Sequence, residues 1–143
     1  MIEIRSPKTI AEWESYYQLR FTVLREPWAQ PLGSEKDEGD KSAYHFALFE
    51  NKELKAAGRL DKIDSHRFQV RYFCVHPLSV RKGFGRMLMN GIENFAFKNN
   101  SAKIILHARE NAVTFYESLG YETVKESYLL FDEIQHYLMQ KEL

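Results

Sequence analysis

The chain has 143 residues, the length of one ordinary domain, so we expect a single domain over residues 1–143. Hydrophobic residues make up 44% and charged residues 28%, a balance typical of folded globular proteins. Lys plus Arg equals Asp plus Glu at 20 each, so no global positive field favours nucleic acid or an anionic membrane. The one cysteine, Cys74, cannot form an internal disulfide, and no apolar segment predicts a signal peptide or membrane span. We therefore expect a cytoplasmic protein.

The first part of the chain predicts a strand over residues 2–5 and a helix from Ile10 to Arg25. Thr9 and Glu12 form a capping-box pattern at the helix start, and Pro27 stops the helix. Apolar residues at helical spacing predict its core face: Ile10, Trp13, Tyr17, Phe21 and Leu24. Residues 28–41 are rich in glycine and charge, so we expect a mobile surface loop there.

The middle of the chain predicts strands over residues 44–50, 54–62 and 68–75, which form an antiparallel meander. In the third strand Phe68, Val70 and Tyr72 alternate with polar residues, as expected when one face is buried. After Pro77 the period becomes helical, with an apolar stripe of Phe84, Leu88, Ile92, Phe95 and Ala96.

The last part of the chain predicts a buried strand over residues 103–108, which completes a strand-helix-strand crossover. A short helix over residues 112–119 stops at Gly120, and strands over residues 122–131 and 134–141 follow. The elements together predict a mixed α+β or α/β fold with a central, mostly antiparallel sheet.

The loop from Val80 to Arg86 carries the strongest chemical signal in the sequence. Gly83 and Gly85 allow the backbone to approach a ligand closely at a helix start, where N–H groups and the helix dipole favour an anion. Arg81, Lys82 and Arg86 add three cations, so the loop is suited to a phosphate group. The alternative is a tight turn with solvated cations. A triphosphate site of the Walker type ranks low because its Gly-Lys-Ser or Gly-Lys-Thr ending is absent.

This loop resembles the pyrophosphate loop of the GNAT superfamily of N-acetyltransferases, which reads Arg/Gln-x-x-Gly-x-Gly/Ala. Gly83 and Gly85 match that pattern, and Lys82 and Arg86 stand where basic residues are common. Val80 departs from it by occupying the usual Arg/Gln position, where the neighbouring Arg81 could supply the charge.

Residues 106–121 resemble the fifth strand and fourth helix of the same family, with its Phe-Tyr-x-x-x-Gly-Phe/Tyr ending. Tyr116 falls on the family's tyrosine, Arg109 takes the place of a frequent Asn, and Asn111 lies nearby but out of register. The segments around Arg20, Gly33, His45, Arg59 and Phe131 look like one branch of uncharacterised GNAT proteins. The resemblance thus covers nearly the whole chain.

The resemblance implies the GNAT fold, with helices on both faces of the sheet, and an enzyme that moves an acetyl group from acetyl-CoA to a primary amine by direct attack. No metal is implied. The residues it assigns to coenzyme A are Phe73, Cys74, Val75, Val80, Arg81, Lys82, Gly83, Phe84, Gly85, Arg86, Arg109, Asn111 and Tyr116.

The resemblance also assigns catalytic roles. The Val75 N–H is the candidate oxyanion donor, and Tyr116 is the candidate general acid for the leaving thiolate, with a core aromatic as its alternative. His136 is the candidate base because the ordinary pKa of histidine, about 6.5, suits proton transfer near neutrality. Glu133, Asp132, His45 and a water chain remain alternatives. Cys74 lies inside a strand and is expected to be an inert packing residue.

Other charged residues allow two interpretations each. The loop acids Glu35, Asp37, Glu38 and Asp40 either attract a cationic amine or form a solvated charge run, and solvation is the expectation. Arg20 and Arg25 either bind an acidic substrate group or cap and solvate the first helix.

Two other function classes remain open from the sequence. The first is a non-catalytic module that binds coenzyme A or has a regulatory role, an interpretation favoured by Val80 and by the lack of an obvious base. The second is a structural dimerisation domain. The identity of the amine and the oligomeric state, a homodimer included, are left open.

Overall fold

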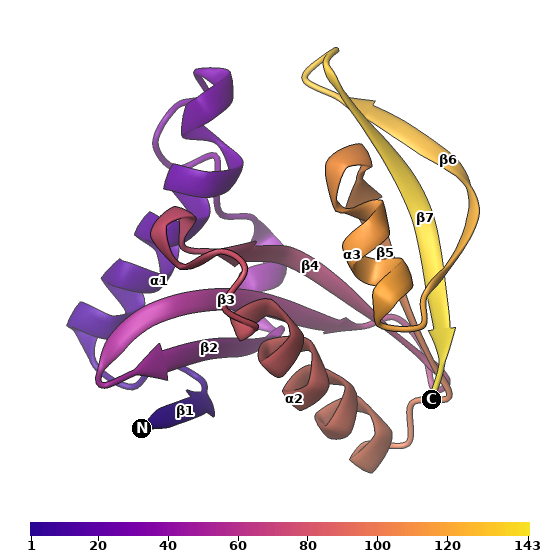
Figure 1. The fold of residues 1–143 in the computed structure, drawn as a ribbon, viewed down its shortest axis with the longest axis horizontal. Coiled ribbons are helices and arrows are strands. Elements are labelled where there is room, and N and C mark those ends of the chain that lie inside the picture. The colour runs from indigo at the N-terminus through magenta and orange to yellow at the C-terminus, as the bar shows by residue number, and fades with distance from the viewer. The chain divides into compact units, whose positions relative to one another are not determined.

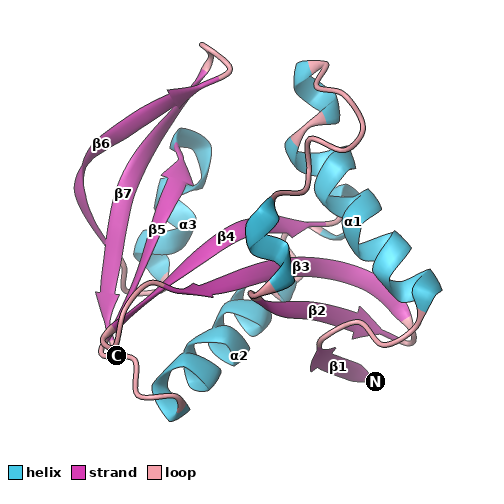
Figure 2. Ribbon diagram, turned by 180° about the vertical axis from the view of Figure 1, so that it is seen from behind, coloured by secondary structure: helices cyan, strands magenta, loops and turns pink.

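The computed structural model describes residues 1–143 and contains a seven-stranded sheet with strand order β1-β2-β3-β4-β5-β7-β6. The strands are β1 (Ile2–Arg5), β2 (Tyr44–Glu50), β3 (Glu53–Lys62), β4 (Arg67–Val75), β5 (Lys103–Arg109), β6 (Glu122–Leu130) and β7 (Ile134–Glu142). The α-helices are α1 (Ile10–Leu24), α2 (Phe84–Lys98) and α3 (Val113–Ser118), and the 3₁₀ turns are η1 (Glu26–Trp28), η2 (Glu38–Lys41), η3 (Pro77–Ser79) and η4 (Glu110–Ala112). β4 and β5 pair in parallel, whereas β1–β2, β2–β3, β5–β7 and β6–β7 pair antiparallel. The predicted mixed, mostly antiparallel sheet is confirmed (Figures 1 and 2).

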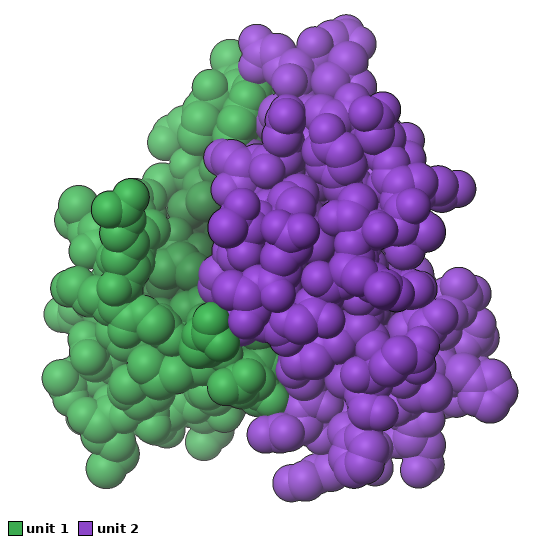
Figure 3. Space-filling view, turned by 45° about the vertical axis from the view of Figure 1, so that its right-hand side comes forward, with its two compact units in different colours: residues 1–61, 72–92 green, residues 62–71, 93–143 purple.

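The chain divides into two compact units (Figure 3). Unit 1 comprises residues 1–61 and 72–92, and unit 2 comprises residues 62–71 and 93–143. The division therefore runs through β4, between Arg71 and Tyr72.

In unit 1, α1 packs against one face of β2 and β3. The helix starts as predicted, since the Thr9 hydroxyl accepts from the Glu12 amide at 3.1 Å. Its buried residues are Tyr16, Leu19, Arg20 and Leu24, so the predicted core face is confirmed at Leu24 and corrected at its other positions. Ile10 is 80% exposed, and Trp13 and Tyr17 are only partly buried. The apolar pattern misplaced the buried face because an arginine lies at its centre.

The other face of the strands in unit 1 is covered by α2. A Cβ atom added at Gly58 on β3 would lie 3.1 Å from the Ile92 and Phe73 side chains, so glycine permits this close approach. The neighbouring residue Ala57 belongs instead to the core cluster with Tyr16 and Leu19. Helices therefore cover both faces of the sheet in unit 1, as expected from strand alternation.

In unit 2, the first part of β4 pairs with β5 from Arg67↔Lys103 to Val70↔Leu106, and β5, β7 and β6 follow. Residues of β5 alternate in burial, with Ile104, Leu106 and Ala108 inside, which confirms the predicted buried strand. α3 is shorter than predicted by one residue at each end, because Ala112 belongs to η4 and Leu119 is the C-cap. None of the helices combines the length and apolar character that crossing a membrane requires.

Candidate active site

The basic loop, residues 80–86, leads from β4 into α2 in unit 1. Arg81 and Gly83 both adopt left-handed backbone conformations, with φ of 65° and 84°. α2 then begins at Phe84, which is buried, and the Met87 amide donates to the Gly83 carbonyl at 3.0 Å. The side chains of Arg81, Lys82 and Arg86 are exposed. The predicted loop at a helix start is confirmed, and its exposed cations and helix dipole suit an anion.

Gly83 leaves space beside its backbone. An added Cβ atom would find only the Met87 methyl carbon, at 3.9 Å. Its positive φ is a conformation that other residues rarely adopt. The glycine is therefore required for backbone conformation rather than for packing.

β4 bends at Tyr72, whose φ of 51° lies in the left-handed region. The strand pairs with β5 as far as Val70, and it ends at Val75, followed by a hydrogen bond from the His76 amide to the Lys55 carbonyl at 2.8 Å. Cys74 lies in the core cluster with Tyr16 and Ala57. Its burial agrees with the expected packing role.

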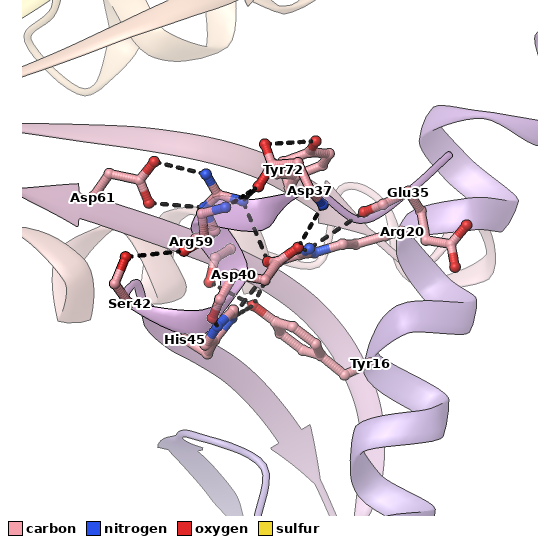
Figure 4. A network of polar contacts seen from close by, with 12 residues as sticks. Tyr16, Arg20, Glu35, Asp37, Asp40, Ser42, His45, Arg59, Asp61 and Tyr72 are labelled. Carbon is pink, nitrogen blue, oxygen red and sulfur yellow. Dashed lines mark hydrogen bonds and ion pairs between the residues drawn. The ribbon is translucent and has the colours of Figure 1, made fainter. Parts of the chain in front are cut away.

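Two arginines are buried at the junction of α1, β3 and β4, in an arginine–aspartate cluster formed by Arg20, Asp37, Asp40, Arg59 and Asp61 (Figure 4). Arg59 is 1% exposed, makes two 2.7 Å bonds to the Asp61 carboxylate and donates to Asp37 at 2.6 Å. Arg20, fully buried, donates to Asp40 at 2.8 Å. Buried guanidinium groups are stable only with such partners.

The cluster corrects the predictions for the loop and for Arg20. Residues 28–41 contain η2, which is closed by a capping box between Asp37 and Asp40. Glu35 is buried and accepts from the Gly33 amide at 2.7 Å. The charge run therefore folds onto Arg20 and Arg59, and Glu38 remains solvated, with 90% of its side chain exposed.

Arg20 neither caps nor solvates the first helix, and its partner is an acid of the same chain. Arg25 also binds internally, to the carbonyls of Ser34 and Leu24 at 3.0 Å each. Sequence reasoning missed the pairing of Arg20 with Asp40 because local sequence holds no signal for contacts between distant segments.

His45, an alternative base, has both ring nitrogens in internal contacts. Its Nε2 donates to the Asp40 carbonyl at 2.8 Å, and its Nδ1 lies 2.9 Å from the Tyr16 hydroxyl. Burial lowers the pKa of His45 and outweighs the opposing hydrogen bond to Asp40, with the Arg20 and Arg59 charges acting in the same direction as burial. Burial also raises the pKa of Tyr16. His45 is thus a structural residue of this region.

In unit 2, the residues matched to the family lie around α3. Tyr116 is 6% exposed, and its ring meets Phe115 at 5.1 Å and Tyr121 at 5.8 Å between centroids. Arg109 ends β5 and is partly exposed, while Asn111 is exposed in η4.

A ring cluster of His107, Tyr128 and His136 lies on the sheet of unit 2. Tyr128 stacks on His136 at 4.4 Å between centroids and meets His107 at 5.3 Å. The His136 Nδ1 lies 3.0 Å from the Ile134 carbonyl, so it donates and leaves Nε2 as the basic nitrogen. Asp132 and Glu133 lie exposed in the turn after β6.

Sequence reasoning did not single out His107, although β5 alternation places it on the same face as Arg109. The structure leaves the buried His107 Nδ1 without a partner. Burial and the charge of Arg71 lower the pKa of His107. These effects disfavour the protonated form of the ring.

The chain is similar to known proteins over nearly its whole length. The chain is 28% identical over 137 residues to the uncharacterized N-acetyltransferase YjcF of Bacillus subtilis, covering 93% of this chain and 97% of the relative. Escherichia coli ElaA superposes with a TM-score of 0.83 at 23% identity, covering 99% of this chain and 100% of that one. An aminoglycoside 6'-N-acetyltransferase complexed with coenzyme A superposes with a TM-score of 0.83 at 14% identity, covering 99% of this chain and 96% of that one.

These likenesses show the acyl-CoA N-acyltransferase fold, and a family model described as the acetyltransferase (GNAT) domain matches residues 18–143. The chain therefore belongs to the GNAT acetyltransferase family.

Proposed function

We propose that this protein transfers the acetyl group of acetyl-CoA to a primary amine of a small molecule or a protein. The observation that carries the proposal is the basic loop, in which two left-handed residues and exposed cations precede the first turn of α2. That geometry gathers backbone N–H groups and positive charge around a phosphate. The coenzyme A bound in the structurally similar aminoglycoside 6'-N-acetyltransferase supports acetyl-CoA as the donor.

In this proposal the residues 80–86 bind the pyrophosphate and the backbone of residues 73–75 aligns pantetheine. The amine nitrogen attacks the thioester carbonyl carbon, the carbon–sulfur bond breaks, and coenzyme A leaves as a thiolate. The Val75 N–H stabilises the negative charge that develops on the carbonyl oxygen. Arg109, Asn111 and Tyr116 complete the coenzyme A contacts assigned by resemblance.

Two protons move in the reaction. The attacking nitrogen loses one proton, for which His136 is our candidate acceptor because its Nδ1 donates to the Ile134 carbonyl, which sets the tautomer that carries the lone pair on Nε2. His107, which lies in the same ring cluster and whose pKa is lowered by burial and by the Arg71 charge, is a second candidate. The leaving thiolate gains a proton or a hydrogen bond from Tyr116.

The family match spans residues from both compact units, which supports our expectation of a single functional domain. The cytoplasmic location stays a prediction.

A non-catalytic module that binds coenzyme A is the second candidate, because Val80 is exposed at the position where the family usually has Arg or Gln. Thiol release from acetyl-CoA across a panel of amines separates the two. Amine-dependent release supports the enzyme, and binding of acetyl-CoA without release from any amine supports the module.

Tyr116→Phe tests the catalytic assignment, because it removes one hydroxyl and keeps the ring contacts with Phe115 and Tyr121. We expect turnover with the best amine to fall by about 100-fold, with little change in coenzyme A affinity. Phe115→Leu is the control for altered packing of the same ring pair. Equal turnover of Tyr116→Phe and the parent across the pH range would make Tyr116 a packing residue.

A further inference from the structure

Tyr72 lies where the backbone of β4 takes an unfavourable conformation. Its φ of 51° suits glycine or asparagine, and a bulky aromatic residue there needs support from its surroundings. Val75, the proposed oxyanion donor, follows in the same strand. A rotation about the Tyr72 backbone would turn the peptide groups that come after it, the Val75 amide included.

The Tyr72 ring is held by cations. The guanidinium carbon of Arg20 lies 4.5 Å from the ring centroid and that of Arg59 lies 5.1 Å from it. The Tyr72 hydroxyl donates to Asp37 at 3.3 Å. Cation–π contacts of this kind strengthen when the cation is removed from water, as both guanidinium groups are here.

The two arginines are themselves fixed by carboxylates. Asp61 holds Arg59 from β3 with two bonds, and Asp40 holds Arg20 from η2 (Figure 4). The Arg20 Nε is buried without a hydrogen-bond partner, so hydrogen bonding alone does not account for the placement of this side chain. Arg20 instead faces three tyrosine rings, at 4.5 to 5.0 Å.

We propose that Arg20 and Arg59 are positioning residues that hold the Tyr72 ring, fix the left-handed turn in β4 and so aim the Val75 amide at the thioester carbonyl. The inference rests on the proposed function for the role of Val75. A buried ion pair is a weak device for stability compared with apolar packing, whereas it fixes orientation well. The cluster therefore acts on catalysis through Tyr72, without touching the substrate.

A double-mutant cycle tests the coupling between Arg59 and Tyr72. Arg59→Lys keeps the charge and loses the two-bond grip on Asp61 and the planar face toward Tyr72. We expect kcat to fall by roughly 10- to 100-fold with the best amine of the panel, because small misplacements of a reacting group have large effects. Affinity for coenzyme A should fall less than kcat, because the proposed pyrophosphate contacts of residues 80–86 do not depend on Tyr72.

The second arm repeats Arg59→Lys in a Tyr72→Gly background, where glycine adopts the positive φ without a ring to hold. There the substitution should change kcat by less than about 2-fold, since the ring through which Arg59 is proposed to act has been removed and coupled residues do not give additive effects. Arg5→Lys is the matched control, because Arg5 also grips a carboxylate with two bonds, to Glu12 at 2.9 Å, and lies over the Phe49 ring at 4.5 Å. Equal losses from Arg59→Lys in both backgrounds would overturn the inference.

The amide resonance of Val75 gives a readout that is independent of turnover. In the ligand-free protein, Arg59→Lys should shift the Val75 amide resonance in the parent background and leave that resonance unchanged in the Tyr72→Gly background. An unmoved resonance in the parent background overturns the inference. If the parent fails to bind acetyl-CoA, the proposed function is wrong. The ligand-free spectra still decide whether Arg59 positions the Val75 amide through Tyr72. If Arg59→Lys fails to fold, Asp61→Asn is used in its place, because it weakens the hydrogen bonds that hold the Arg59 guanidinium.

Discussion

Two regions of unit 1 are rich in arginine, and they differ in whether its charge is buried and paired or exposed to solvent. In the arginine–aspartate cluster, Arg20 and Arg59 are buried and held by Asp37, Asp40 and Asp61. In the basic loop, Arg81 and Lys82 point into solvent beside a helix start. The first region has acids of its own to neutralise its cations, and the second offers its cations to a ligand.

The contrast separates a structural use of charge from a binding use. A buried cation must be neutralised within the fold because desolvation is costly, whereas an exposed cation costs little and remains free for an external anion. Substitutions in the cluster should therefore change stability and, through Tyr72, turnover, whereas substitutions in the loop should change affinity.

The largest expected effect is on stability, in Asp40→Asn. Asp40 neutralises Arg20, and its carboxylate also accepts from the Asp37 amide at 2.9 Å. Breaking a buried pair costs about 3–5 kcal/mol, so we expect a decrease of that size in the unfolding free energy at pH 7 from urea titration. Glu38→Gln, in the exposed pair with Lys41, is the control and should cost less than about 1 kcal/mol. Similar losses in the two variants would remove the distinction between buried and exposed charge.

We also expect the stability difference between the parent and Asp40→Asn to depend on pH. Burial alone would raise the pKa of Asp40, but hydrogen bonds from Asp37 and Arg20 and the nearby Arg charges outweigh it and lower the pKa. A folded-state pKa below the unfolded one means that acid favours unfolding. The contribution of Asp40 is present above the ordinary Asp pKa of about 3.9 and is lost as the pH falls toward the folded value. The stability difference between parent and Asp40→Asn should therefore shrink below about pH 4.

The next effect is on affinity, in Gly83→Asp. The added carboxylate would face the bound pyrophosphate, and the positive φ of 84° disfavours any side chain. We expect coenzyme A affinity to fall by at least about 100-fold in calorimetry, since charge-assisted hydrogen bonds are worth roughly 1.5–3 kcal/mol each. Gly33→Asp is the matched control, because Gly33 also has a positive φ, of 105°, and open space around it. Unchanged affinity in folded Gly83→Asp would remove the loop from the coenzyme A site.

The sequence predicted the elements and the basic loop well, because both depend on neighbours in the chain. Gly83, Gly85 and the helix that follows are recognised from spacing alone, and the apolar stripe of α2 from its period. The α1 face was misplaced because charged residues were assigned to solvent by default. Arg20 is buried only because Asp40 and Tyr72, from distant segments, meet it in the folded chain.

The ring cluster in unit 2 was partly predictable. His136 was a candidate on chemical grounds alone, while its stacking on Tyr128 depends on the irregular register between β6 and β7. His107 could have been found from β5 alternation combined with the pairing of Arg109 with His136, since directly opposed residues share a face. Strand register was the missing information.

The smallest expected effect concerns Arg81, which we expect to replace the cation missing at Val80. Arg81 has a φ of 65°, so asparagine, which tolerates this conformation, is a better test than alanine. Arg81→Asn should weaken coenzyme A binding by about 3- to 5-fold at low salt and less at high salt, because exposed ion pairs are worth at most about 1 kcal/mol and are screened. Val80→Arg should bind at least as tightly as the parent. Lys98→Ala, which removes a cation from the last turn of α2, controls for net charge. Equal affinities of Arg81→Asn and the parent at low salt would leave the phosphates to Lys82, Arg86 and the backbone amides of the loop.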